Sequence, residues 1–157
     1  MSAGAPSGGD PARGGDPVSG GRGDPGRNDR IARFAGDPPS PWEQAYSFSR
    51  LVSAGGWVLV GGTTSVDVDG AVRGETPYEQ TAEILRKIEH ELARAGASLA
   101  DVVQTRVYVV DISRADEVGR AHGECFGDLR PLMTMVEVSA LIDPRMLVEI
   151  EAVAVGG

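Results

Sequence analysis

The sequence has few of the residues that form disulfides, bind metal ions or span a membrane. Cys125 is the single cysteine among 157 residues, so no internal disulfide can form. The histidines His90 and His122 stand alone, and no cysteine–histidine cluster has the spacing of metal ligands. No apolar run approaches the roughly 18 residues that span a bilayer, and the first residues carry no apolar signal segment. We therefore expect a cytoplasmic protein with no metal site and no membrane partner.

Positive charge is also scarce. The chain has 15 lysines and arginines against 23 aspartates and glutamates, a formal net charge of -8. Nucleic acid backbones and anionic membrane surfaces are bound through clustered lysine and arginine. The charge balance thus predicts that neither is a partner.

Apolar residues are almost missing from residues 1–29, which are mainly Gly, Pro, Ser, Asp and Arg. A segment with so little to bury cannot offset the entropy lost on ordering. We interpret residues 1–29 as a disordered tail and residues 30–157 as one domain. If this boundary is right, removal of the tail leaves the thermal midpoint unchanged.

The β-branched runs in the rest of the chain predict a mixed β-sheet. Thr134–Val138 and Leu147–Val155 are β-branched runs on either side of Asp143-Pro144, a pattern that favours two paired strands joined by a turn. Further strands are expected over Trp57–Val60 and Val103–Val110, and a hairpin turning at Asp69-Gly70. Alternation in the second of these strands places Val103, Thr105, Val107 and Val109 on one face. The first candidates for burial are Tyr46, Phe48 and Leu51.

Two segments carry helix signals. Thr76, Pro77 and Glu79 form a capping box, and the apolar repeat that follows ends at Gly96. A second helix is expected from Ser113 to Gly127. Strands and helices in this order belong to the α/β (α+β) class.

Two helices can cover only one face of such a sheet. The alternation of side chains along the strands places both apolar and charged residues on the other face. The apolar residues are Tyr108, Met133, Met135 and Val153, and the charged ones are Arg106, Glu137, Glu149 and Glu151. A face this apolar is expected to pack against other subunits, and clefts between subunits are common ligand sites.

Several residues have two interpretations. Gly61-Gly62 at a strand end permits close approach of a ligand or marks a bulge. His122 is on the helix face that is expected to point into the core. It is either a hydrogen-bonded core histidine or a group that transfers protons. Arg106 supplies positive charge to a ligand or pairs with Glu149 or Glu151. Cys125 is better interpreted as a small buried hydrophobe than as a nucleophile.

The motifs together resemble those of the YjgF/RidA (Rid) family of small trimeric proteins. The matching motifs lie between Pro41 and Val155: Gly61-Gly62-Thr63, Gly96 to Val103, Arg106-Val107-Tyr108-Val109, Arg130-Pro131, Val136-Glu137-Val138 and Val148-Glu149-Ile150-Glu151-Ala152. The resemblance implies a chorismate-mutase-like fold with a six-stranded sheet and two helices on one face. It also implies a homotrimer with clefts between subunits and, for the best-known branch, hydrolysis of reactive enamines and imines.

Half of that branch's site matches this sequence. Glu149 is at the position of the glutamate that activates water or relays a proton, and Gly61 at a backbone position near the substrate. Met133 stands where the branch has the arginine that pairs with the substrate carboxylate, and Met135 stands where it has a cysteine. Loss of one partner of a desolvated arginine–carboxylate pair costs about 2 to 5 kcal/mol. We therefore expect a substrate without an amino-acid carboxylate.

The predicted chemistry needs an acid–base group and a positioned water, but no cofactor. Glu149 is the candidate catalytic residue, because burial among apolar side chains raises the pKa of a carboxyl group. The candidate binding residues are Phe48, Gly61, Gly62, Arg106, Tyr108, Met133, Met135 and His122. Condensation or tautomerisation at imine or carbonyl centres is a related possibility. The alternative is a non-catalytic trimer that binds a small metabolite or a partner enzyme.

Overall fold

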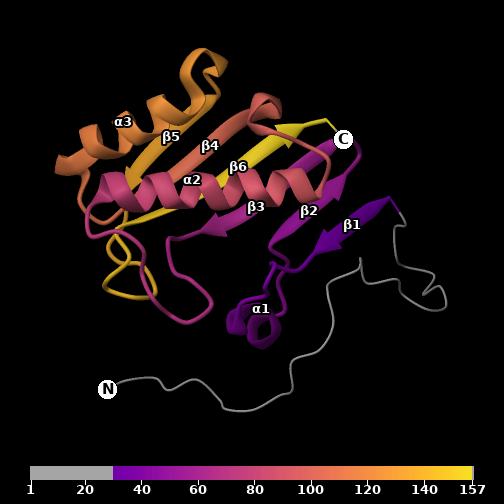
Figure 1. The fold of residues 1–157 in the computed structure, drawn as a ribbon, viewed down its shortest axis with the longest axis horizontal. Helices are drawn as coiled ribbons and strands as arrows, with labels where there is room; N and C mark the ends of the chain where they lie inside the picture. The colour runs from indigo at the N-terminus through magenta and orange to yellow at the C-terminus, as the bar shows by residue number, and fades with distance from the viewer. Residues whose placement is uncertain (1–29, 157) are drawn as a thin grey trace.

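The computed structural model of the chain describes residues 30–156, so the expected tail over residues 1–29 lies outside the described residues. Over residues 30–156, six strands form one sheet in the order β1-β2-β3-β6-β4-β5 (Figure 1). The strands are β1 (Ile31–Phe34), β2 (Leu51–Ala54), β3 (Trp57–Thr63), β4 (Val102–Val109), β5 (Leu132–Glu137) and β6 (Val148–Val155). β4 and β5 are parallel and the other neighbours antiparallel, which confirms the predicted six-stranded mixed sheet.

The helices begin and end largely where the sequence predicts. In α2 (Pro77–Arg94) the Thr76 side chain accepts a hydrogen bond from the Glu79 backbone N–H, so the predicted capping box is present. α3 (Ala115–Phe126) is preceded by a 3-10 turn over Ile112–Arg114, and Asp111 rather than Ser113 provides the cap. Gly127 ends α3 with a positive φ of 49°, so the helix closes at the expected residue. A short helix, α1 (Pro41–Tyr46), was not predicted.

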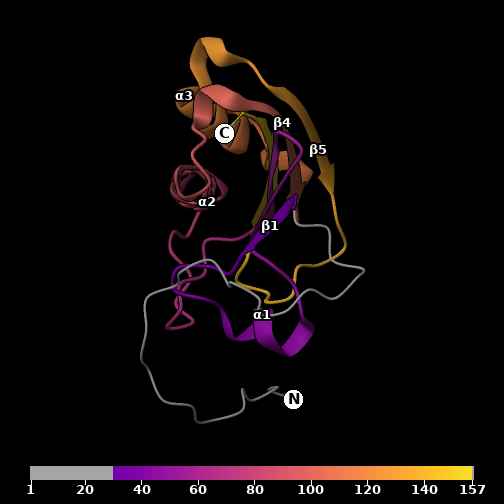
Figure 2. The ribbon, with the colours of Figure 1, turned by 90° about the vertical axis from the view of Figure 1, so that its right-hand side faces the viewer.

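The molecule has two layers. Figure 2 shows α2 and α3 on the same side of the sheet, with α1 beyond one end of the strands. The core lies between helices and sheet, and Ile84, Ile88, Val107 and Ile150 in it are fully buried. The other sheet surface, called here the open face, has no helix over it among the described residues.

The hydrophobic alternation assigns β6 correctly and β4 in part. Val148, Ile150, Ala152 and Ala154 are buried, so Glu149 and Glu151 point to the open face as predicted. In β4, Thr105, Val107 and Val109 are buried, but Val102 is buried in place of Val103. The β4–β6 register shifts between Val102 and Gln104, and such an irregularity reverses the alternation on one side of it.

Two sequence expectations about strands and burial are wrong, and a third holds in a shorter form. β5 and β6 do not pair, because β4 lies between them. The hairpin expected at Asp69-Gly70 is present but short: Val66 and Val72 form one antiparallel bridge, and the Asp67 and Arg73 N–H groups donate to the Ala71 and Ser65 carbonyls at 2.8 and 3.0 Å. Tyr46 and Phe48, expected in the core, are exposed, and only Leu51 of that group is buried.

No helix within residues 30–156 combines the length and apolar character needed to cross a membrane.

Candidate active site

Glu149 is a half-buried carboxylate on the open face. It lies near the start of β6, directly opposite Tyr108 of β4. Burial raises the pKa of Glu149 because it disfavours the charged form. The nearby positive charge of Arg50 opposes this rise, and the negative charge of Glu151 adds to it. The carboxyl group is thus held in an environment suited to gaining and losing a proton.

The backbone of Gly62 lies against this carboxylate. A Cβ atom added at Gly62 would overlap Glu149 Oε1 and come within 3.1 Å of its Cδ. The β3–β6 register also shifts between Val60 and Thr63. The register shift favours the bulge interpretation of Gly61-Gly62. Gly62 also leaves space for the Glu149 side chain, whereas approach of a ligand to this pair stays a prediction.

Arg50 is the site residue that sequence reasoning missed. It directly precedes β2, its backbone N–H donates to the Phe34 carbonyl at 2.9 Å, and its carbonyl accepts from the Gly61 N–H at 2.9 Å. Its Nη1 donates to the Gly62 carbonyl at 2.6 Å, and its Nη2 lies 3.8 Å from Glu43 Oε1. The local sequence does not reveal this contact, since the carbonyl that Arg50 holds is 12 positions away.

Phe48 lies next to Arg50, whose guanidinium carbon is 6.0 Å from the ring centroid. The ring also borders an open groove of about 400 Å³ beside α1. The other lining residues are Ala35, Pro39, Ser40, Pro41, Glu43 and Gln44. Phe48 thus connects the Glu149 region with this groove.

Arg106 and Glu151 form an ion pair on the open face. Arg106 Nη1 donates to Glu151 Oε1 at 2.7 Å across neighbouring strands. The salt-bridge interpretation of Arg106 is therefore correct, with Glu151 as its partner.

His122 does not lie with Glu149. It is 7% exposed on the helix side of the sheet, where its Nε2 is 2.9 Å from Thr105 Oγ1 and its ring is 4.5 Å from that of Phe126. Burial lowers the pKa of His122, which favours the neutral ring. The structure thus favours the core-histidine interpretation.

The expectation that Met133, Met135 and Glu137 share the face of Glu149 is wrong within one protomer. β5 pairs with β4 in parallel register, with Met133 opposite Thr105 and Met135 opposite Val107. Residues paired in this way point to the same face, and Met135 packs against the core. The side chains of β5 therefore alternate in the opposite sense to the one expected. The assignment of both methionines to a ligand site stays a prediction, and it requires another subunit.

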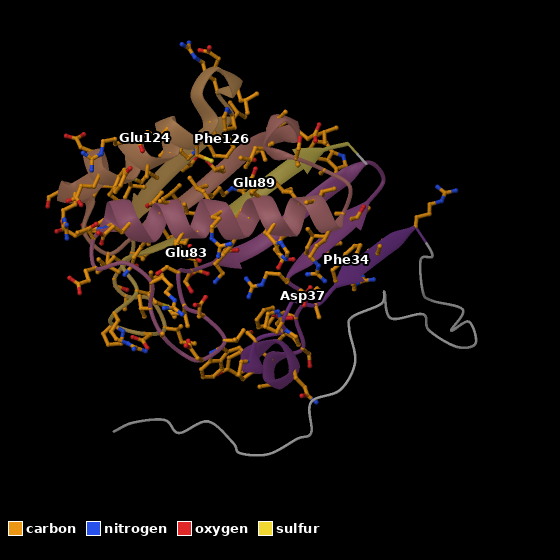
Figure 3. The ribbon with its side chains drawn as sticks, in the orientation of Figure 1. Phe34, Asp37, Glu83, Glu89, Glu124 and Phe126 are labelled. Atoms are coloured by element: carbon orange, nitrogen blue, oxygen red, sulfur yellow. The ribbon has the colours of Figure 1, made fainter. Side chains whose placement is uncertain are left out.

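The helix-side charges are separate from this site. Glu83 and Glu89 belong to α2 and Glu124 to α3, so they project from the layer that covers the opposite sheet surface (Figure 3). Cys125 of α3 is half-buried, and burial raises the pKa of its thiol, which disfavours the thiolate. Within residues 30–156, no three His, Cys, Asp or Glu side chains are placed to hold a metal ion.

Taken together, the open face brings Glu149, Gly62, Arg50 and Tyr108 close to one another. A half-buried carboxylate beside an open surface can transfer protons to and from a small molecule and a water. The nearby arginines are already engaged, Arg106 by Glu151 and Arg50 by Gly62 and Glu43.

Comparison with known proteins agrees with this fold. The family model described as Endoribonuclease L-PSP matches residues 40–156. The crystal structure of Rv2704 from Mycobacterium tuberculosis, a member of the YjgF/YER057c/UK114 family, is 47% identical and superposes with a TM-score of 0.72. That match covers 80% of this chain and 98% of the other.

Two curated relatives extend the comparison. The uncharacterized protein SCO2049 of Streptomyces coelicolor is 39% identical over 118 residues, which are 75% of this chain and 88% of that protein. The 3-aminoacrylate deaminase RutC of Acinetobacter baylyi is 35% identical over 75 residues, which cover 48% of this chain and 59% of that enzyme.

Proposed function

Because the chain belongs to the Endoribonuclease L-PSP family, the YjgF/RidA family to which its motifs pointed, we propose that it hydrolyses a reactive imine or enamine to a carbonyl compound and ammonia. The observation that carries this proposal is the half-buried Glu149 carboxylate packed against the Gly62 backbone. Similarity to a 3-aminoacrylate deaminase over part of the chain supports the same reaction class.

In this reaction Glu149 moves protons and forms no covalent bond. Its carboxylic acid protonates the imine nitrogen, and the resulting carboxylate takes a proton from the attacking water, which yields a carbinolamine. Glu149 then protonates the amino group, the C–N bond breaks, and the hydroxyl proton returns to the carboxylate as the carbonyl forms. An enamine enters the same sequence after protonation at carbon. A pKa raised by burial suits this cycle, because both protonation states are needed.

We propose that the substrate has no carboxylate. Met133 occupies the position at which the better-known branch has its carboxylate-binding arginine. Arg106 and Arg50 are already paired with Glu151 and Glu43. A substrate anion brought here would therefore be desolvated without a free cationic partner, whereas an iminium cation is favoured by the carboxylates.

The family description names an endoribonuclease, but the charges of this chain do not favour RNA as its substrate. The net charge is -8, and the candidate site has Glu149 and Glu151 on its surface. Binding of a phosphate backbone relies on clustered positive charge, which these residues oppose.

We further propose that the working form is a homotrimer, with clefts where the open face of one subunit meets its neighbour. Exposed Trp57, Leu59 and Val155 support packing of this face. Such an arrangement lets Met133 of a second subunit approach the Glu149 of the first.

The test is a panel of freshly generated imines, with and without a carboxylate, scored by ammonia and carbonyl release. We expect the wild type to hydrolyse carboxylate-free members, and Met133→Arg to gain activity on 2-aminoacrylate. Binding of the panel members without turnover, unchanged in Glu149→Gln, would contradict the enzyme proposal and favour a metabolite-binding trimer.

A further inference from the structure

Glu43 anchors a set of contacts that leads to the catalytic candidate. It is 6% exposed in α1, and its carboxylate accepts the backbone N–H groups of Gly36 at 2.8 Å and Ser40 at 3.1 Å. A Cβ at Gly36 would lie 2.8 Å from Glu43 Oε1, so this approach depends on glycine. The contacts with Gly36 and Ser40 thus hold the Glu43 carboxylate in place independently of Arg50.

Arg50 extends from Glu43 towards Glu149. Its side chain is 18% exposed, with Glu43 at Nη2, the Gly62 carbonyl at Nη1 and the Phe48 ring nearby. Contacts on three sides restrict the guanidinium to one position. That position is set by β1, β2 and β3 together, since the Arg50 backbone bonds both to Phe34 and to Gly61.

The carbonyl held by Arg50 belongs to the residue that touches Glu149. The Glu149 carboxylate leaves no room for a Cβ atom at Gly62. A shift of the Gly62 backbone would therefore change the surroundings of the carboxylate. Lys87 secures the following loop by donating to the Thr64 and Val66 carbonyls, each at 2.8 Å. Thr63 Oγ1 donates to the Gly61 carbonyl at 2.8 Å. Among the described contacts, the side chain that bonds the Gly62 carbonyl itself is that of Arg50.

We propose that Arg50 is a positioning residue for Glu149: it clamps the Gly62 backbone against the carboxylate and sets the local charge, while Glu43 holds Arg50 in place. This inference rests on the proposed function for its catalytic consequence. Its structural consequence, the effect of Arg50 on Glu149, can be measured without turnover.

The charged and titratable groups around Glu149 define what a variant should change. Glu151 and its partner Arg106 lie on the same face, Tyr108 lies opposite on β4, and Arg50 approaches from the β2 side. The positive charge of Arg50 lowers the pKa of Glu149 against the effect of burial. Removal of that charge should raise the pKa of Glu149 further.

The experiment titrates the Glu149 carboxyl by carbon-13 NMR in the full chain, with its signal assigned by its loss in Glu149→Gln. Arg50→Met removes the charge and the clamp, whereas Arg50→Gln removes the charge and keeps a donor for the Gly62 carbonyl. Arg50→Lys keeps the charge. Arg94→Met is the matched control, because Arg94 is 20% exposed and also bonds one carboxylate, Glu91, and one backbone carbonyl, Ala35.

We expect the Glu149 midpoint to move to higher pH in Arg50→Met and Arg50→Gln, and to stay near the wild-type value in Arg50→Lys and Arg94→Met. If Arg50→Met does not fold, Arg50→Gln still tests the effect of the Arg50 charge on the Glu149 midpoint. An unchanged Glu149 midpoint in the charge-removing variants would overturn the proposal.

Kinetics on an accepted imine then test the catalytic consequence. We expect kcat of Arg50→Met to fall about 10-fold to 100-fold, as misplaced catalytic groups do, with the pH–rate profile moving in the same direction as the titration. A shifted titration in a protein that turns over no imine would support the positioning role and reject the proposed reaction. Imine turnover by the wild type, together with an unchanged Glu149 midpoint in the Arg50 variants, would support the proposed reaction and reject the positioning role of Arg50.

Discussion

Burial acts on two residues of this protein with opposite signs. It raises the pKa of Glu149, whose charged form is an anion, and lowers the pKa of His122, whose charged form is a cation. The consequences differ because Glu149 faces an open surface, where protons can be exchanged with a ligand. His122 is packed between Thr105 and Phe126. Glu149 is the catalytic candidate and His122 a core residue because of where the two side chains lie, since both can carry a proton.

His122 should make stability depend on pH. Its pKa is lower in the folded chain than in the unfolded chain, so protons bind preferentially to the unfolded state. Its contribution is fully present above the unfolded pKa of about 6.5 and is lost as the pH falls through the folded pKa. We expect the thermal midpoint of the wild type to fall more than that of His122→Asn between pH 7 and pH 5.

The comparison between variants is needed because Glu149, whose pKa is raised by burial, changes stability in the opposite direction as the pH falls. His90→Asn is the control, since His90 is exposed on α2. Equal loss of stability on acidification in the wild type and His122→Asn would show that His122 is not the titrating group.

At the scale of elements, one side chain connects three segments around the start of β6. Gln80 of α2 is 1% exposed. Its Nε2 donates to the carbonyls of Gly74 and Arg145, at 3.1 and 3.0 Å, and its Oε1 accepts the Leu147 N–H at 2.8 Å. The loop before β6 is therefore fixed to the first turn of α2, which sets where Glu149 begins its strand.

Gln80→Leu should destabilise the fold strongly. The change leaves partly buried backbone groups of Gly74, Arg145 and Leu147 without their Gln80 partner, at a cost of about 2 to 4 kcal/mol in the free energy of unfolding. Chemical denaturation measures this cost, with exposed Gln44→Leu of α1 as the control. A denaturation midpoint for Gln80→Leu equal to that of the control would contradict the bridging role.

The elements that sequence reasoning found are those with local signals. α2 was predictable because its capping box, its apolar repeat and the following Gly96 are all encoded within the segment. The partner of β5 was not, because pairing with β4 rather than β6 depends on contacts distant in sequence. The face of Met133 and Met135 depends on how β5 joins the sheet and was assigned wrongly within one protomer, whereas the face of Glu149 follows from alternation within β6 and was assigned correctly.

Arg50 shows the same limit at the site. Nothing in the residues around it indicates that its guanidinium reaches Gly62, since the contact exists only once β2 and β3 pair. A polar residue just before a strand, next to the bulged glycines of its partner strand, is the signal that could have drawn attention to it.

The whole molecule has one covered and one open sheet surface, and the candidate site is on the open one. Leu59, 42% exposed, lies opposite Val153 near the centre of that surface. A single layer of helices leaves such side chains in water unless another subunit covers them. The proposed trimer therefore completes both the packing and the site.

Leu59→Glu should convert the proposed trimer to monomers, because it introduces a charge into the surface that subunits would bury. Light scattering after size-exclusion chromatography measures the mass directly. Val68→Glu is the control, since Val68 is 58% exposed and lies in the loop after β3 rather than on the sheet. A wild-type mass equal to that of one chain would reject the trimer.

The most direct test of the proposed reaction is the initial rate of ammonia release from a carboxylate-free imine, compared between the wild type and Glu149→Gln. Glu89→Gln, on the opposite side of the sheet, is the matched control. We predict that Glu149→Gln lowers the rate by about 100-fold to 10,000-fold, the usual contribution of a general acid–base group, while Glu89→Gln matches the wild type. Equal rates for the wild type and Glu149→Gln would contradict the assignment of Glu149 as the catalytic residue.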